Sequence, residues 1–312
     1  MRVLVVGAGA TGGYFGARLV AAGRDVTFLV RPARAARLAA HGLVVRSPLG
    51  DLHLPAPATV TADGIENPFD LVLLSCKAYD LEAAAAAVAP AVGSGTAVLP
   101  ILNGMAHLDA LDARFGPERV LGGSCAIAAT LGPEGEIVQL SDLHALTFGE
   151  RDGSRSERVG RIARTLEGAG FAARLSDRIL LEMWEKWVFL AALACGTCLM
   201  RGAVGDIVAA PGGRALMLGL LDECRGVAAG EGYPPRERFF ESSRGTLTAE
   251  DSAFTASMLR DIARGAPIEA DHIVGDLIRR GRAAAPEQAL PHLSLAYTHL
   301  KAYEHRRARE AA

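Results

Sequence analysis

The sequence predicts an α/β N-terminal domain, built on a doubly wound parallel sheet, followed by an all-helical C-terminal domain. Three observations predict it. Short apolar runs alternate with helical patterns through the first half, a glycine loop follows the first run, and strand patterns disappear from Arg178 onward. Such alternation favours a parallel sheet covered by helices. We expect the two domains at residues 1–176 and 177–312.

The first domain opens with a strand at Arg2–Val6, whose apolar β-branched residues are typical of a buried parallel strand. An amphipathic helix starting at Ala10 and a strand at Val26–Val30 follow. The other expected elements are a helix at Ala33–His41, a hairpin of Leu43–Arg46 and Leu52–Leu54, a strand at Leu71–Ser75, a crossover helix at Leu81–Val92, a strand at Ala97–Leu102, antiparallel strands at Val120–Leu131, Ile137–Leu140 and Leu146–Gly149, a helix at Ser156–Gly168 and a strand at Ala172–Leu175.

The second domain shows long helical patterns only. They are expected at Ile179–Met200, Gly213–Glu231, Thr255–Ile262, Glu269–Ala284 and Leu290–His305. Its longest apolar run, Trp187–Met200, is too short to cross a bilayer and indicates a buried helix. The apolar stretch Gly213–Ala228 could support a homodimer. Ligands of open α/β sheets bind beyond the carboxyl ends of the strands, and clefts between domains are preferred sites.

Composition excludes several classes of partner. The chain has 312 residues and a net charge of −2, with 50% apolar and 22% charged residues. Nothing in this balance indicates binding to nucleic acid or to a membrane surface. The N-terminus enters a strand directly, so no signal peptide is expected. We expect a small-molecule partner instead.

The five cysteines indicate a reducing compartment, and hence a cytoplasmic protein, because their number is odd and they lack disulfide spacing. Cys195 and Cys198 formally make a C-x-x-C motif. They fall inside the apolar helix, without a second cysteine pair or histidines at zinc spacing. We therefore expect no metal or redox role for them.

The glycine loop is the most informative motif. Gly7, Gly9 and Gly12 have G-x-G-x-x-G spacing between a strand and a helix, the context that dinucleotide binding requires. The first glycine allows the tight turn, the second lets the backbone approach a pyrophosphate, and the third lets helix and strand pack closely. The helix start directs free N–H groups at the phosphates. The loop residues between the glycines are Ala8, Ala10 and Thr11.

Arg31 indicates that the cofactor is NADP(H). NAD-binding versions end the second strand in a carboxylate that accepts from the ribose 2′-OH, whereas this strand is followed by Arg31. A carboxylate would repel a 2′-phosphate, and a guanidinium can bind it through two hydrogen bonds. Arg37 fits the solvated face of the next helix. Sequence alone leaves Arg34 undecided between these two roles.

Two polar residues follow apolar strands on the side of the sheet where ligands bind. Lys77 comes directly after Leu71–Cys76, and Asn103 ends the strand that runs to Leu102. We expect both at the crevice near the nicotinamide half of the cofactor. Lysine there suits phosphate or substrate charge, and asparagine suits hydrogen bonds to carboxamide, ribose or substrate. The alternative for each is a solvated loop residue.

Lys186 and Glu269 are the candidates for chemistry in the helical domain. Lys186 lies between Trp184 and Trp187 at the start of an apolar helix face. A partly desolvated lysine needs a counter-charge, or its pKa falls. Glu269 follows Pro267, where a helix begins. The alternatives are a surface lysine and a glutamate that stabilises a helix dipole.

With these residues in place, the chain resembles the ketopantoate reductases (2-dehydropantoate 2-reductases), NADPH-dependent enzymes of pantothenate and coenzyme A synthesis. The resemblance covers almost the whole chain and rests on an ordered set of motifs. They are Gly7–Gly16, the strand end at Lys77, Ile101–Met105, Trp184–Lys186 with Thr197 further along, Ser257–Asp261 and Glu269.

The resemblance implies a role for each matching residue. The three glycines hold the pyrophosphate, while Arg31 and Lys77 contact the 2′-phosphate or the other cofactor phosphates. Asn103 contacts cofactor and substrate near the hydride. Lys186 is the general acid that polarises the ketone and protonates the new alkoxide. The substrate hydroxyl binds Glu269, which also helps to hold the lysine, and the substrate carboxylate binds Ser257.

One departure leaves the substrate open. The best-known members of the family carry asparagines one and two turns after the lysine, where this chain has Leu190 and Ala194. A less polar pocket discriminates less sharply for a hydroxylated substrate. The leading hypothesis is reduction of 2-dehydropantoate to (R)-pantoate. A second is reduction of another small 2-oxo acid, and a third is a non-catalytic NADP(H) sensor, which has no need of Lys186 with Glu269.

Overall fold

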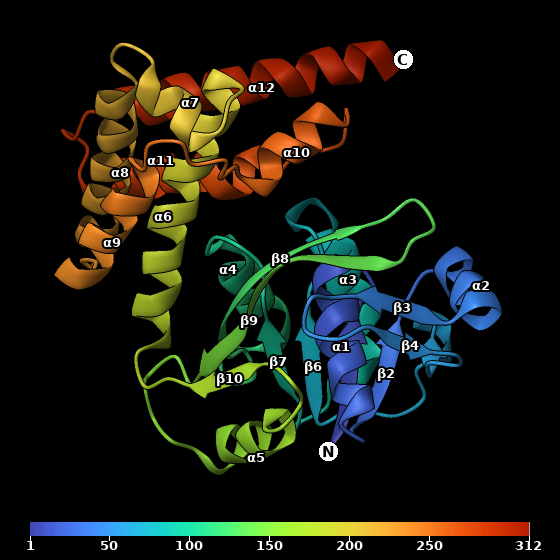
Figure 1. The fold of residues 1–312 in the computed structure, drawn as a ribbon. Coiled ribbons are helices and arrows are strands. Elements are labelled where there is room, and N and C mark those ends of the chain that lie inside the picture. The colour runs from blue at the N-terminus through green and yellow to red at the C-terminus, as the bar shows by residue number, and fades with distance from the viewer. Residues whose placement is uncertain (312) are drawn as a thin grey trace. The chain divides into compact units, whose positions relative to one another are not determined.

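The computed structural model describes residues 1–311, which divide into two compact units (Figure 1). The first contains residues 1–102 and 107–179 and is built from strands and helices. The second consists of the short segment Asn103–Ala106 together with the chain from Leu180 onward. The boundary therefore falls three residues beyond the expected one. In addition, Asn103–Ala106 packs with the second unit, although its place in the sequence suggested the first.

A five-stranded parallel sheet forms the centre of the first unit, in the order β5-β2-β1-β6-β7. Most of its side chains are buried, and those of β6 and β7 entirely so, as expected for strands covered on both faces. The strand order reverses at β1, so the crevice outside β1 and β6 is the position where such sheets bind ligands. The strands are β1 (Arg2–Val6), β2 (Asp25–Leu29), β5 (Thr59–Val60), β6 (Leu71–Leu74) and β7 (Ala97–Pro100).

Helices connect these strands and complete the core. Phe15 of α1 and Phe28 of β2 are fully buried in one apolar cluster with Val3 and Val5. The helices of this unit are α1 (Ala10–Ala21), α2 (Pro32–His41), α3 (Leu81–Val88), α4 (Ala106–Phe115) and α5 (Glu157–Leu166). Strand β5 and helix α4 were not predicted, because two residues carry no period and α4 is only weakly amphipathic.

A second, mixed sheet has the order β10-β9-β3-β4, with β8 paired to β9. The expected hairpin is confirmed, since β3 and β4 pair antiparallel. The two short strands expected after residue 136 form one long strand, β9, whose middle residues are half exposed and break the apolar pattern. The strands are β3 (Leu43–Arg46), β4 (Leu52–Leu54), β8 (Gly122–Leu131), β9 (Ile137–Gly149) and β10 (Ala172–Leu175).

The second unit is helical throughout its described residues. The long helix α8 packs against α7, α11 and α12. Glycines lie at several close approaches between the helices. A Cβ on Gly196 of α6 would lie 2.3 Å from the sulfur of Met217 on α8. The helices are α6 (Ile179–Met200), α7 (Val204–Ala209), α8 (Gly213–Gly230), α9 (Glu237–Leu247), α10 (Ser257–Ala263), α11 (Asp276–Ala284) and α12 (Pro291–Ala311).

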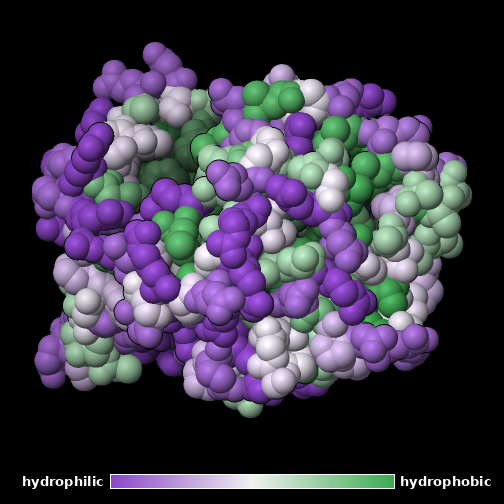
Figure 2. All heavy atoms as spheres, turned by 90° about the horizontal axis from the view of Figure 1, so that it is seen from below, coloured by the Kyte–Doolittle hydropathy of each residue, from purple (hydrophilic) through white to green (hydrophobic). Residues whose placement is uncertain are grey.

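Two details of this unit differ from expectation. The short helices α7 and α9 were not predicted. The single helix expected over Glu269–Ala284 is interrupted by one turn of π-helix, η4 (Asp271–Gly275), before α11 begins. Hydrophilic and hydrophobic residues are interspersed on the face shown in Figure 2. Among residues 1–311, none of the helices combines the length and apolar character needed to span a bilayer.

Candidate active site

The glycine loop has the geometry that its spacing predicts. Gly7 has φ +90°, a conformation that other residues rarely adopt, and its N–H donates to the carbonyl of Leu29 at 2.9 Å. A Cβ on Gly12 would lie 2.0 Å from Ser75 Oγ and 2.7 Å from the Gly7 carbonyl oxygen. Helix α1 therefore packs against β1 and β6 at a distance that only glycine permits.

Gly9 differs from its neighbours because a Cβ there would meet no atom within 4 Å. It precedes the first turn of α1, whose N-terminus has no side-chain cap. Open space in front of uncapped N–H groups fits a pyrophosphate. The loop can thus hold the dinucleotide that the sequence predicts.

Arg34 supports this loop from behind. Its guanidinium is half-buried and donates to the carbonyls of Ala8 at 3.0 Å and Gly135 at 3.1 Å. Burial lowers the pKa of Arg34, and the nearby charge of Arg37 lowers it further. The sequence left Arg34 undecided between binding of the 2′-phosphate and a solvated helix face. In the structure Arg34 has a structural role, since it joins the glycine loop to the turn between β8 and β9.

Arg31 and Lys77 come from the carboxyl ends of β2 and β6, the two strands beside β1. Arg31 is exposed and its guanidinium lies 2.7 Å from the carboxylate of Asp80. Lys77 precedes the short turn Ala78–Asp80 that holds this carboxylate. An exposed ion pair contributes only about 0–1 kcal/mol. Breaking the ion pair so that the Arg31 guanidinium can bind a phosphate therefore costs little free energy.

Lys186 lies on α6 between two buried tryptophans. The rings of Trp184 and Trp187 have centroids 4.8 Å apart, and Tyr233 stacks on Trp184 at 5.9 Å. The adjacent Glu185 is buried and accepts from the backbone N–H and the guanidinium of Arg236. Within residues 1–311, no hydrogen bond or ion pair reaches the half-buried Lys186 ammonium, so its pairing with Glu269 stays a prediction.

Asn103 and Glu269 belong to the same unit as Lys186, and His272 is close to both. Glu269 is buried, and His272 follows it by three residues, in the π-helical turn. The His272 ring is hydrogen-bonded to the backbone of Asn103 and interacts electrostatically with Glu269. His272 was not predicted as a site residue. The available signal was its spacing from Glu269, since residues three apart share a helix face.

Ser257 is exposed at the first position of α10. The apolar residues that replace the expected asparagines have different environments, because Ala194 is buried and Leu190 is half-buried. One residue before Leu190, Phe189 stacks on Phe254 with ring centroids 6.2 Å apart. An aromatic pair therefore lies on the two segments that carry Lys186 and Ser257.

The C-x-x-C motif lies in the interior of the helical unit. Cys195 and Cys198 are fully buried in α6. Burial raises the pKa of Cys195 well above its usual value and that of Cys198 to about 12, so both stay protonated. No group of side chains suited to a metal ion occurs in residues 1–311.

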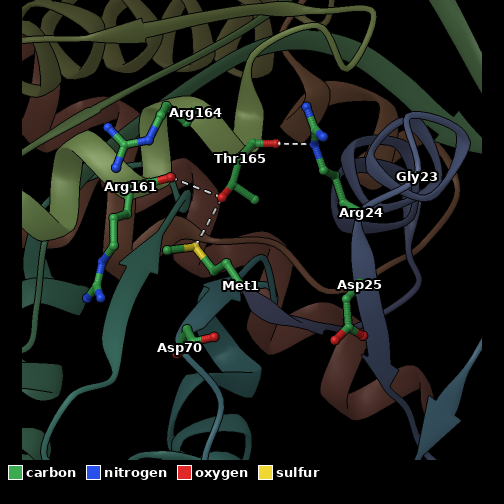
Figure 3. A pocket seen from close by; sticks show the side chains of 8 residues that line it. All are labelled: Met1, Gly23, Arg24, Asp25, Asp70, Arg161, Arg164 and Thr165. Atoms are coloured by element: carbon green, nitrogen blue, oxygen red, sulfur yellow. Dashed lines mark hydrogen bonds between the residues drawn. The ribbon is translucent and has the colours of Figure 1, made fainter.

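A separate cavity of about 550 Å³ lies in the first unit at the amino ends of β1 and β2 (Figure 3). Arg24 is engaged there, since its Nε donates to the Thr165 carbonyl at 2.8 Å. This edge is opposite to the glycine loop, so the cavity is not the expected cofactor site. Its lining residues are Met1, Gly23, Arg24, Asp25, Asp70, Arg161, Arg164 and Thr165.

A parallel sheet with a dinucleotide loop, joined in sequence to a helical unit with a half-buried lysine, defines a class of nicotinamide-dependent oxidoreductases. Two family models match the chain. The model described as "Ketopantoate reductase PanE/ApbA" matches residues 3–153, and the model described as "Ketopantoate reductase PanE/ApbA C terminal" matches residues 178–304. The chain therefore belongs to the ketopantoate reductase family.

Individual relatives match nine-tenths or more of the chain. It is 38% identical to "Uncharacterized oxidoreductase YkpB" of Bacillus subtilis (strain 168), over 97% of this chain and 99% of that protein. A 2-dehydropantoate 2-reductase of Mesorhizobium japonicum is 30% identical, over 90% of this chain and 92% of the relative. The crystal structure of a 2-dehydropantoate 2-reductase from Geobacter metallireducens GS-15 superposes with a TM-score of 0.87 at 29% identity, covering 96% and 99% of the two chains.

Proposed function

We propose that the protein is an NADPH-dependent reductase that converts 2-dehydropantoate to (R)-pantoate. The observation that carries the proposal is Lys186, a half-buried ammonium with no partner in residues 1–311, on a helix of a family that includes 2-dehydropantoate 2-reductases. A non-catalytic cofactor sensor has no use for such a group. Arg31, where NAD-binding proteins have a carboxylate, supports NADPH as the cofactor.

The residues of this chain divide the work. When bound, the cofactor supplies the hydride, and the open space at Gly9 with the uncapped N-terminus of α1 holds its pyrophosphate. Lys186 stabilises the negative charge that develops on the ketone oxygen and then donates its proton. Glu269 accepts from the substrate hydroxyl, and Ser257 donates to the substrate carboxylate.

Replacing the lysine tests the proposal. In Lys186→Ala we expect kcat to fall by about 10²–10⁴, the usual contribution of a general acid, while NADPH still binds as in the wild type. Lys186→Arg keeps the positive charge but cannot donate a proton near neutral pH, so its kcat should also stay low. Absorbance of NADPH at 340 nm measures turnover. Normal turnover in Lys186→Ala would exclude the acid role.

A second candidate is reduction of a 2-oxo acid with an apolar side chain. It is favoured by Leu190 and Ala194 and by the stacked pair of Phe189 and Phe254. A panel of 2-oxo acids with hydroxylated, branched and aromatic side chains separates the two candidates. A higher kcat/KM on a branched or aromatic acid than on 2-dehydropantoate would favour the second. Leu190→Asn should then shift the preference towards the hydroxylated substrate.

A further inference from the structure

The π-helical turn Asp271–Gly275 connects several parts of the second unit. The carboxylate of Asp271 accepts from Tyr297 at 2.5 Å and from Lys301 at 2.8 Å, both on α12. The carbonyl of Ile273 accepts from Trp187 Nε1 on α6 at 2.9 Å. A turn that begins two residues after Glu269 is thus fixed both to the C-terminal helix and to the residue beside Lys186. π-Helical turns are frequent at functional sites.

His272 makes the third connection, to the segment Asn103–Ala106. A Cβ on Gly104 would lie 3.0 Å from Cδ2 and 3.2 Å from Nε2 of the His272 ring, and 3.0 Å from the His272 carbonyl oxygen. Gly104 also has φ +77°, a conformation that favours glycine. The ring is hydrogen-bonded to the Asn103 backbone. The imidazole therefore lies directly against the backbone that presents the Asn103 side chain.

Charged groups surround this ring. Burial lowers the pKa of His272 below its usual value of 6.5, and Arg280 lowers it further. Glu269, the Asn103 hydrogen bond and Asp276 act in the opposite direction, but burial is the largest effect. The ring is therefore neutral at pH 7, and a proton added at lower pH would place a new positive charge beside Glu269.

We propose that His272 is a positioning residue, which holds the Asn103 backbone beside Glu269 so that both side chains reach one substrate in a single geometry. The inference rests on the proposed function, since it assigns Asn103 and Glu269 to substrate. It adds a residue that acts through them. The neutral imidazole is the working form, because its one ring N–H suffices for the backbone contact and adds no charge beside the carboxylate.

Three variants test the inference. His272→Leu removes the hydrogen bond, and we expect a loss of kcat of ten-fold or more at pH 7.5 with NADPH affinity changed less than three-fold. His272→Asn and His272→Gln each place an amide donor near one of the ring nitrogens, so at least one of them should restore most of kcat. In that rescued variant, the acid limb of the kcat profile should move to lower pH, because an amide side chain at position 272 does not gain a proton in this range.

The matched control is His299→Leu. His299 is a half-buried histidine on α12 of the same unit. Its pKa is also lowered by burial, and it is hydrogen-bonded to the backbone of Cys198 on α6. We expect its kcat and pH profile to match the wild type. If His272→Leu has wild-type kcat and an unchanged acid limb, the positioning role is wrong. A merely structural role would lower the melting temperature of His272→Leu and leave the pH limb in place.

A readout without turnover separates this inference from the proposed function. Hydrogen–deuterium exchange of the peptide covering Asn103–Ala106 should be at least ten-fold faster in His272→Leu than in the wild type, and unchanged in His299→Leu. Unchanged exchange in both variants overturns the inference. If the wild-type protein reduces none of the 2-oxo acids, the proposed function fails, and the exchange rates still decide whether His272 fixes this segment.

Discussion

Two glycines of the same loop should respond in opposite ways to the same substitution. A methyl group at Gly12 would overlap Ser75 Oγ and come within 2.7 Å of the Gly7 carbonyl oxygen, part of the backbone. At Gly9 it would meet no atom within 4 Å, and the backbone there has φ −85°, which alanine tolerates. Gly12→Ala should therefore lower the stability of the fold. Gly9→Ala should leave the fold intact and mainly reduce the open space beside residue 9.

The structure sets the expected magnitudes. Overpacking costs about 1–3 kcal/mol, and each kcal/mol lowers the melting temperature of a domain of this size by roughly 2–4 °C. Gly12→Ala should therefore lose roughly 2–12 °C. Gly9→Ala should keep its melting temperature or gain slightly, since restricting the unfolded chain stabilises by about 0.4–1 kcal/mol. If a pyrophosphate occupies the space at Gly9, its affinity should fall at least ten-fold, or about 1.4 kcal/mol.

The assay combines thermal melts without cofactor and titration of NADPH fluorescence. The wild type and both variants are compared at one pH and salt concentration. Tight NADPH binding by Gly9→Ala would refute the placement of the pyrophosphate. A melting temperature of Gly12→Ala equal to that of the wild type would refute the close packing of α1 against β6.

Three further outcomes are expected. Arg31→Ala should raise the Kd for NADPH at least ten-fold and leave the Kd for NADH within two-fold. The melting temperature should stay the same, because the ion pair of Arg31 is exposed. Equal losses of affinity for both cofactors would contradict the 2′-phosphate role. The pKa values of His272 and His299 are lowered in the fold, so the unfolded chain takes up protons first as pH falls through about 6.5. Stability should therefore fall from pH 7.5 to 5.5, and less so when both are replaced by Gln. A thiol reagent should label the partly exposed Cys76 in the native protein but Cys198, whose pKa is raised to about 12, only after unfolding.

Local signals explain what the sequence could predict. The strand β1 was placed correctly to the residue, and α1 begins at the expected Ala10, because an apolar run and a glycine spacing are properties of adjacent residues. The limits of α6 also agree with expectation, since a long apolar helix has many residues that contribute to one pattern. Prediction failed for β5 and α7, which have too few residues to carry a period of their own.

Tertiary contacts explain what the sequence could not predict. Asn103 belongs to the second unit, and its backbone is hydrogen-bonded to the His272 ring, which is separated from it by more than 160 residues of chain. No pattern of adjacent residues reports such a contact. Arg34 is a similar case, because its two carbonyl partners lie on the glycine loop and on a distant turn. The conformation of the glycine loop could be predicted from the spacing of its glycines, whereas the contacts of the Arg34 and His272 side chains could not be predicted from their neighbours in sequence.

The tryptophans beside Lys186 also provide an optical probe. The chain has two tryptophans in all, Trp184 and Trp187, and both are fully buried in α6. Emission excited at 295 nm therefore comes from one helix of one unit. Its red shift during denaturation reports the opening of the helical unit, while the fluorescence of NADPH, the cofactor that we propose, is expected to report the glycine loop of the other. The two halves of the protein can thus be followed separately in a single cuvette, without an added label.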